Sequence, residues 1–157
     1  MSNRFYAVCG IVEIDGKILF VRHTYGTAKE KILLPGGYVK EGELPSQACE
    51  REFFEETSIK THARSVFAAQ FMTDQWCIVF IMDFISGEPV SDGYENSEVL
   101  LLTPEEAVER PDITNMSRHI LRAYIAKKEN QLEKGNYIPD ANNTDPREIY
   151  GTGPFRD

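Results

Sequence analysis

The sequence predicts an α/β fold in which helices cover a mixed β-sheet, and two observations carry this prediction. Strand-like and helix-like segments alternate irregularly, and the strand-like segments are joined both by short turns and by longer helical stretches. Antiparallel strands can follow a tight turn whereas parallel strands need a crossover, so the combination favours a mixed sheet. With 157 residues, 41% of them hydrophobic, the chain is long enough for one domain with a substantial core.

The first part of the chain is predicted to form a hairpin and then a sharp turn. Residues 6–14 are rich in Val and Ile, the Asp15-Gly16 pair is a typical two-residue turn, and residues 17–22 form the returning strand. After a polar loop over residues 25–31, the segment Pro35-Gly36-Gly37 allows the backbone to turn and to approach its neighbours closely.

A helix is predicted to begin at Pro45, because proline suits the first helical position, although Leu44 would be a poor N-cap. We expect this helix to end near Thr57. Beyond it, strand-like and helix-like patterns predict three further strands and two further helices. The strands are expected at residues 61–71, 76–84 and 98–102, and the helices at residues 104–109 and 117–128.

The composition shifts from Lys134 onward to Gly, Pro, Asn and Asp, which favours loop structure. We therefore expect one domain over residues 1–133 and a loop-like C-terminal tail over residues 134–157. The tail also carries aromatic side chains that either pack on this subunit or a neighbouring one, or remain unattached. These aromatic residues are Tyr137, Tyr150 and Phe155.

Composition and charge argue against several classes of function. The net charge of −8 disfavours broad binding to nucleic acid, which needs a basic face. Cys9, Cys49 and Cys77 are widely spaced and odd in number, so we expect reduced thiols rather than a disulfide framework. The sequence lacks a start typical of a signal peptide and an apolar run long enough for a bilayer, so we expect a cytoplasmic protein without a membrane partner.

The first predicted helix carries a high concentration of negative charge. Residues 41–56 contain six Glu and a single basic residue, Arg51. Glu52, Glu55 and Glu56 stand at spacings i, i+3 and i+4, so all three project from one side of the helix near its C-terminal end. Like charges at this spacing repel one another, and the helix macrodipole disfavours negative charge at that end.

Two interpretations of this Glu triplet remain open on these observations alone. Most runs of charge are solvated helix faces, and the triplet by itself does not exclude that role. A hard divalent cation is the functional alternative, because Mg²⁺ and Mn²⁺ prefer oxygen ligands. A bound ion of this kind would polarise a phosphoryl group and orient an attacking water.

Residues 37–59 favour the second interpretation, because they are similar to a known family motif. Gly37, Glu43, Arg51-Glu52-Phe53 and Glu55-Glu56 stand at the spacings of the Nudix box, G-x5-E-x7-R-E-U-x-E-E-x-G-U, where U is a bulky apolar residue. The preceding Leu34-Pro35-Gly36 matches the usual lead-in. The sequence thus closely resembles the Nudix hydrolase (MutT-like) family.

One position departs from the box, since Ser58 stands where the family has glycine. A glycine just past a helix end normally takes the left-handed conformation, which another residue adopts at a cost of about 1 kcal/mol. We expect a slightly altered helix exit but an intact metal site, because Ser58 has no role as a ligand.

The resemblance implies an α/β/α sandwich and a set of site residues. Glu52 or Glu56 would act as the catalytic base, and Arg51 would orient the carboxylates through an ion pair with Glu43. The metal, Mg²⁺ or else Mn²⁺, would be held by the box carboxylates and a nearby backbone carbonyl. These implied ligands are Glu52, Glu55, Glu56 and Gly36 or Gly37.

Residues outside the box supply further candidates. Arg22 ends the predicted second strand, where relatives use an arginine to contact substrate phosphate, and a surface arginine is an equally good interpretation. Gly37 is a second candidate for substrate binding. Glu98 resembles an additional metal ligand of some relatives, with Glu95 as the alternative in the same loop. Three aromatic residues could stack on a base, although such residues on strands are more often core; they are Tyr25, Phe71 and Trp76.

The resemblance implies a metal-dependent pyrophosphohydrolase that splits the diphosphate linkage of a nucleoside diphosphate derivative. The sequence does not rank nucleoside triphosphates, nucleotide sugars, ADP-ribose and dinucleoside polyphosphates as substrates. One alternative is a catalytically silent ligand-binding domain of the same fold, and another is an RNA-end pyrophosphatase, which the acidic charge disfavours. The partner would be a small nucleotide-type molecule, and a homodimer is expected on family analogy alone.

Overall fold

The computed structural model describes residues 2–136, 138, 141 and 146–152. Its strands are β1 (Ser2–Ile14), β2 (Lys17–His23), β3 (Ile32–Leu33), β4 (Gly36–Lys40), β5 (Lys60–Phe71), β6 (Trp76–Ser86), β7 (Asn96–Leu102), β8 (Leu132–Lys134) and β9 (Tyr150–Gly151). Its helices are α1 (Pro45–Thr57), α2 (Pro104–Val108) and α3 (Asn115–Lys127).

The strands form a mixed sheet, as the sequence predicts. The main path runs β3-β2-β1-β6-β5-β8-β9, while β4 pairs with β1 and β7 pairs with β2. β1 and β6 run parallel, with Val8 opposite Ile78, whereas the β1–β2 and β5–β6 neighbours are antiparallel. The crossover between β1 and β6 contains α1, which places this helix against the sheet.

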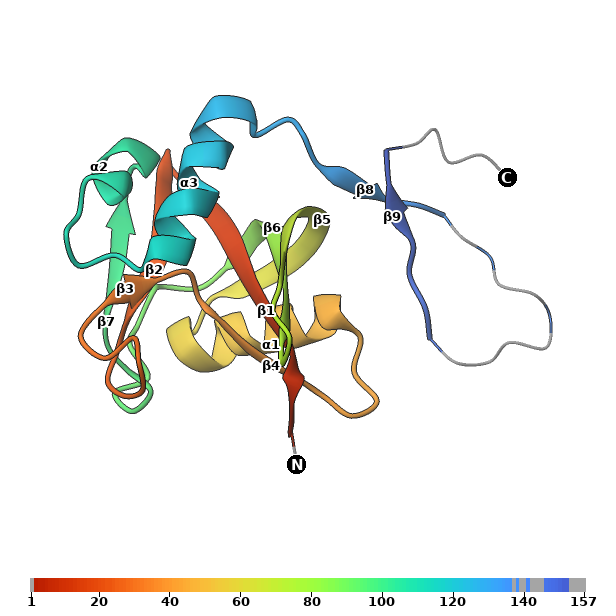
Figure 1. Ribbon diagram of the computed structural model, residues 1–157, viewed down its shortest axis with the longest axis horizontal. Coiled ribbons are helices and arrows are strands. Elements are labelled where there is room, and N and C mark those ends of the chain that lie inside the picture. Colours follow the sequence, from red (N-terminus) through yellow and green to blue (C-terminus); the bar gives the residue numbers. More distant parts are fainter. Residues whose placement is uncertain (1, 137, 139–140, 142–145, 153–157) are drawn as a thin grey trace.

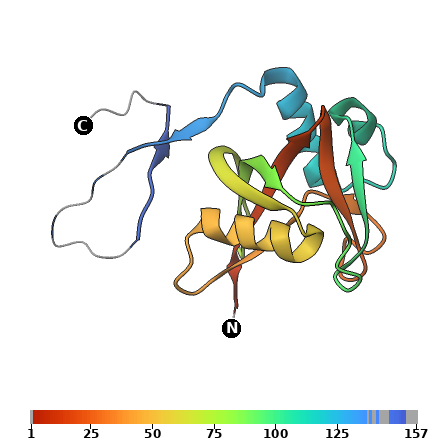
Figure 2. The ribbon, with the colours of Figure 1, turned by 180° about the vertical axis from the view of Figure 1, so that it is seen from behind.

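The helices lie on opposite sides of the sheet, with α1 on one side and α2 and α3 on the other (Figures 1 and 2). Alternate residues of β1 separate the two cores. Val8 and Val12 pack with Phe53 of α1, whereas Ile11 packs with Leu121 of α3. This period of two is what a strand buried on both faces requires. The predicted α/β/α sandwich is therefore confirmed.

Helix α1 covers the predicted residues 45–57, and the structure shows how its first turn is satisfied. Leu44 lacks a capping side chain, but its backbone N–H donates to Gln47 Oε1 at 3.0 Å. α3 begins two residues before the predicted start, because the hydroxyl of Thr114 accepts a bond from the backbone N–H of Ser117 and caps the helix. None of the helices in the described residues has the length and apolarity that a membrane span requires.

The described part of the tail is not entirely loop. Residues 132–134 extend the sheet along β5, and Tyr150–Gly151 adds β9 beside them. The ring of Tyr150 packs edge-on against Phe80, with 5.9 Å between ring centroids. One tail aromatic thus packs on this subunit, while Tyr137 and Phe155 lie outside the described residues.

Ser58 ends α1 in the conformation that glycine would normally supply. Its φ of 64° and ψ of 12° are left-handed, and its N–H donates to Phe54 O at 3.0 Å. The helix exit therefore keeps the usual geometry, and the departure from the family appears as local strain at Ser58 instead of a changed path.

We expect Ser58→Gly to raise the free energy of unfolding by about 0.5–1 kcal/mol, because glycine adopts this conformation without a Cβ penalty. Urea titration followed by circular dichroism measures the change. Ser58→Ala is the matched control, since it keeps the Cβ and should leave stability nearly unchanged. Equal stabilisation by both variants would show that the hydroxyl, and not the backbone, is the source of the cost.

Candidate metal centre

Three carboxylates meet at the C-terminal end of α1. Glu52 and Glu56 lie one helical turn apart on α1, and Glu95 comes from the loop that precedes β7. One carboxylate oxygen from each residue lies within 4.8 Å of the others. Burial is the main factor that raises the pKa of all three carboxyls, and the neighbouring carboxylates raise the pKa of Glu56 further. The group therefore favours a bound proton or cation over three free negative charges.

Glu56 is the least solvated member of this carboxylate cluster, with 3% of its surface exposed. The backbone of Gly36 lowers the pKa of Glu56, but by less than burial and the neighbouring carboxylates raise it. Its Oε2 is buried and has no hydrogen-bond partner among the residues that the structure describes. A buried, unpaired anionic oxygen beside two further carboxylates is a good ligand for a hard cation such as Mg²⁺ or Mn²⁺, so the residues fit the metal that the sequence predicts.

The two glycines of β4 allow α1 to approach the sheet at this point. A Cβ atom on Gly37 would lie only 2.4 Å from Cδ of Glu52. A Cβ atom on Gly36 would lie 2.1 Å from the backbone oxygen of Val8. A side chain at either position would therefore displace the carboxylate or the strand. Gly37, predicted to contact substrate, borders the cluster directly.

Arg51 links the carboxylates of α1 to the loop before the helix. Its guanidinium donates to Glu43 through Nε at 2.8 Å and Nη2 at 3.0 Å, so the expected ion pair is present. It also donates to Glu52 at 2.9 Å and to the backbone oxygen of Tyr38 at 2.9 Å. These bonds lower the pKa of Glu43 and hold Glu52 in place. Glu55, which the sequence predicts as a ligand, is not a member of the cluster, and its exposed carboxylate bonds to Arg51 at 3.1 Å.

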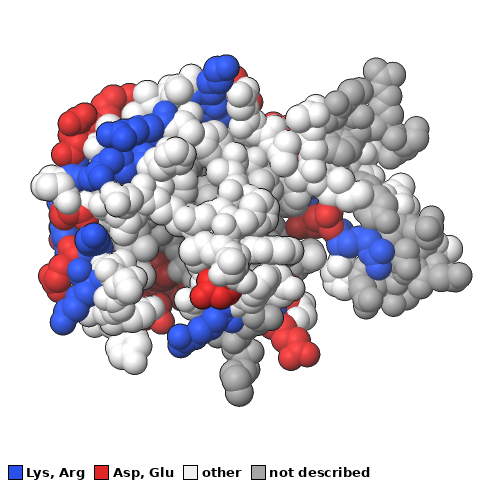
Figure 3. All heavy atoms as spheres, in the orientation of Figure 1, with Lys and Arg blue, Asp and Glu red and all other residues white. Residues whose placement is uncertain are grey.

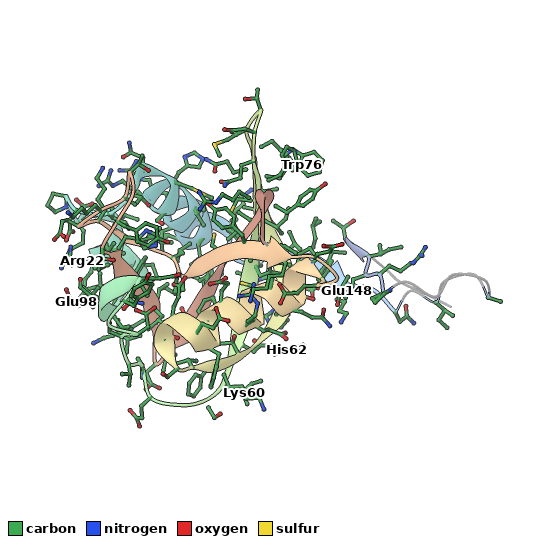
Figure 4. The ribbon with its side chains drawn as sticks, turned by 90° about the horizontal axis from the view of Figure 1, so that it is seen from below. Arg22, Lys60, His62, Trp76, Glu98 and Glu148 are labelled. Carbon is green, nitrogen blue, oxygen red and sulfur yellow. The ribbon has the colours of Figure 1, made fainter. Side chains whose placement is uncertain are left out.

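Arg22 and Glu98, two candidates from outside the box, contact each other (Figure 4). They are register partners on β2 and β7, and Arg22 Nε donates to Glu98 Oε2 at 3.0 Å. Arg22 also donates to Asp112 at 3.0 Å and to the backbone oxygen of Glu30 at 2.8 Å. Nε and Nη1 of the guanidinium are thus both bonded within the chain. Glu98 does not join the carboxylate cluster, and the alternative Glu95 does.

The aromatic candidates lie in two different places. Tyr25 is 52% exposed and stacks on His23, with 5.3 Å between ring centroids and 11° between planes. Burial raises the pKa of the Tyr25 hydroxyl first, and the charges of Glu95 and Glu56 raise it further. The preceding residue, Thr24, donates through its backbone N–H to the backbone oxygen of Glu95 at 3.2 Å, so Tyr25 directly follows a residue that contacts the loop of the cluster. Phe71 and Trp76 instead pack against each other at the tip of the β5–β6 hairpin. Trp76 lies far from Arg22 in Figure 4.

Comparison with known proteins adds a family to this geometry. A family model described as the NUDIX domain matches residues 3–124. An ADP-ribose pyrophosphatase from Methanocaldococcus jannaschii is 38% identical over 88 residues, which cover 52% of each protein, so the chain spans about half the length of this curated relative.

Solved structures share the fold at lower sequence identity. A NUDIX hydrolase from Nitrosomonas europaea superposes with a TM-score of 0.72 at 23% identity, over 82% of this chain and 74% of that one. A MutT protein from Methanosarcina mazei Go1 gives a TM-score of 0.68 at 20% identity, over 80% and 95% of the two chains. At these identities the likeness shows the fold alone.

We expect Glu56→Gln to raise the free energy of unfolding of the metal-free protein at pH 7.5. Burial raises the folded-state pKa of Glu56, so the wild type loses stability as pH rises from the unfolded pKa, near 4.3, through the folded one. The gain at pH 7.5 should be about 1–3 kcal/mol, the range for an unsatisfied buried group, and should disappear near pH 4. Urea titration in chelator at the two pH values measures it.

Glu41→Gln is the matched control, because Glu41 is an exposed residue just before the same helix. It should change stability little at either pH. A Glu56→Gln variant that is no more stable than the wild type at pH 7.5 would contradict the view that the ionised carboxylate is costly without a cation.

Proposed function

The chain belongs to the NUDIX domain family, and on that premise we propose that it is a divalent-metal-dependent hydrolase of the diphosphate linkage in a nucleoside diphosphate derivative. The observation that carries the proposal is the cluster of Glu52, Glu56 and Glu95 with its unpaired buried Oε2. An acidic site can accept a phosphorylated substrate only if a cation reverses the local charge. A metal site and a diphosphate substrate therefore support each other.

The residues of the cluster have separate tasks in this proposal. Glu52, Glu56 and Glu95 would hold Mg²⁺ or Mn²⁺, and Glu55 at the cluster's exposed side would be a further ligand after a change of its bond to Arg51. When bound, such an ion supplies charge neutralisation at phosphorus and lowers the pKa of water. Glu52 or Glu56 would accept the proton of the attacking water. Arg51 keeps Glu52 in position through its bond of 2.9 Å.

The substrate that we propose to test first is ADP-ribose, because the curated relative that matches 88 residues is named an ADP-ribose pyrophosphatase. Tyr25 follows Thr24, which bonds to Glu95, and its exposed ring offers a stacking surface for the base of such a compound. Arg22 is a weaker candidate for a phosphate contact, since its Nε and Nη1 already donate to Glu98 and Asp112.

The surface gives less support to an RNA-end substrate. On the face shown in Figure 3, basic and acidic side chains intermingle toward one edge, and the described residues form no broad basic patch there. With a net charge of −8, an RNA chain would lack the attraction that backbone binding needs. A catalytically silent domain would be the remaining alternative if no compound is hydrolysed.

We expect hydrolysis of ADP-ribose or a related diphosphate with Mg²⁺ or Mn²⁺, and none in chelator. Glu52→Gln and Glu56→Gln should each lower kcat by about 100-fold or more, because each removes a proposed ligand or base. Glu41→Gln should keep wild-type turnover. Phosphate or nucleotide release measures all of these. If the folded wild type hydrolyses neither ADP-ribose nor the related diphosphates with either metal, the catalytically silent domain would be favoured.

We expect Tyr25→Ala to raise KM by about tenfold with a smaller change in kcat, because base stacking contributes on the order of 1–3 kcal/mol. Phe71→Ala is the matched control, since Phe71 is also an exposed aromatic residue but lies at the hairpin tip. Steady-state kinetics on the identified substrate compares the two. If the two substitutions change KM equally, or if neither changes it, Tyr25 is not part of the proposed binding surface.

A further inference from the structure

We propose that Asn96 is a positioning residue that fixes Glu95 against α1 and so completes the carboxylate cluster. The inference rests on the metal-dependent function proposed above. Glu52 and Glu56 are placed by the helix that carries them, but Glu95 belongs to the loop between β6 and β7. The place of its carboxylate therefore depends on how that loop is attached to α1.

The side chain of Asn96 makes this attachment. Asn96 is 1% exposed, and its Nδ2 donates to the backbone oxygen of Glu56 at 2.9 Å. Carbonyl groups in the last turn of a helix have no partner within the helix, so this bond satisfies an acceptor that the fold would otherwise leave unpaired. The bond joins the residue after Glu95 directly to the backbone of a second cluster member.

The other end of the Asn96 amide organises the loop itself. Asn96 Oδ1 accepts a hydrogen bond from Ser91 Oγ at 2.6 Å, and the backbone N–H of Asn96 donates to Asp92 Oδ1 at 3.0 Å. Ser91 Oγ also accepts from the backbone N–H of Gly93 at 3.0 Å. Asn96 thus connects a folded turn to the helix, and both its amide donor and its amide oxygen are used.

Glu95 is held from its other side by the end of β2. The backbone oxygen of Glu95 accepts from Thr24 N at 3.2 Å, and the Thr24 hydroxyl donates to the adjacent backbone oxygen of Tyr94 at 2.8 Å. The register of β2 against β7 shifts between Arg22 and His23, where Asn96 pairs with His23. Irregularities of this kind re-aim side chains at the edges of sheets. Glu95 is therefore held between β2 and α1, and Asn96 supplies the side-chain bond to α1.

A second contact attaches the loop to α1 without the help of Asn96. The backbone N–H of Val90 donates to Thr57 O at 2.9 Å, so the start of the loop is tied to α1 without any side chain. Loss of the Asn96 amide should leave this bond in place. The loop would then remain docked at its start, while Glu95 would lose its fixed distance to Glu52 and Glu56.

Binding of Mn²⁺ to the full chain, followed by electron paramagnetic resonance of the free ion, tests the proposal without any substrate. We expect Asn96→Ala and Glu95→Gln each to weaken Mn²⁺ affinity by about tenfold or more, as the loss of an outer partner or a ligand does. The double variant should bind Mn²⁺ no more weakly than Glu95→Gln alone. Non-additivity of this kind is expected only if Asn96 acts through Glu95.

Thr114→Ala is the matched control for general destabilisation, because it removes the cap of α3 on the other side of the sheet. It should lower the melting temperature without changing Mn²⁺ affinity. If Asn96→Ala does not fold, Ser91→Ala removes the bond to Asn96 Oδ1 and should weaken Mn²⁺ binding in the same direction by a smaller factor.

Two results would overturn the inference. The first is that the Asn96→Ala variant binds Mn²⁺ as tightly as the wild type does. The second is that Asn96→Ala weakens Mn²⁺ binding by the same factor in the wild type and in the Glu95→Gln variant. A different result would be that the wild type does not bind Mn²⁺, or that Glu56→Gln leaves its Mn²⁺ affinity unchanged. It would refute the proposed metal-dependent function itself, and the inference with it.

Discussion

The main constraint on this part of the structure is the placement of three carboxylates together at the C-terminal end of α1. Coulombic repulsion opposes this arrangement, the helix macrodipole opposes it at that end, and burial of Glu56 adds a desolvation cost. Arg51 balances part of the charge at Glu52, and the backbone of Gly36 lowers the pKa of Glu56. The remaining negative charge does not stabilise the chain on its own, which is why we attribute the cluster to function and not to folding.

The core around α1 explains how the fold tolerates this cost. Phe53, between two cluster residues in sequence, is fully buried against the sheet and anchors the helix. Gly10 of β1 leaves room for it, since a Cβ there would lie 2.9 Å from the Phe53 ring and 2.6 Å from Met82. Glycines on β1 and β4 therefore permit a close helix–sheet contact. Apolar burial on one side of α1 offsets the electrostatic strain on the other.

The same contact explains why the cluster draws on two parts of the chain. A helix presents neighbouring carboxylates along one face only, so Glu52 and Glu56 would contact a cation from one side and leave its other side open. The loop before β7 supplies Glu95 from that side, because Asn96 and Thr24 attach the loop to α1 and β2. Rigid elements thus carry two members, and hydrogen bonds to a loop place the third.

The sequence by itself determined the longer elements and the carboxylates that α1 presents together, because both depend on spacing along a single segment, whereas the short strands β3, β4, β8 and β9 were not predicted. The helix over residues 45–57, the common face of Glu52 and Glu56 and the mixed sheet all follow from local patterns. Only the tertiary structure decided that Glu95 joins the cluster while Glu98 pairs with Arg22. A shift of one residue in strand register moves a side chain to the other face of the sheet, so the register of β7 against β2 decides which glutamate reaches the cluster. That register depends on contacts of Asn96 with residues distant in the sequence, which the local pattern of the loop does not report.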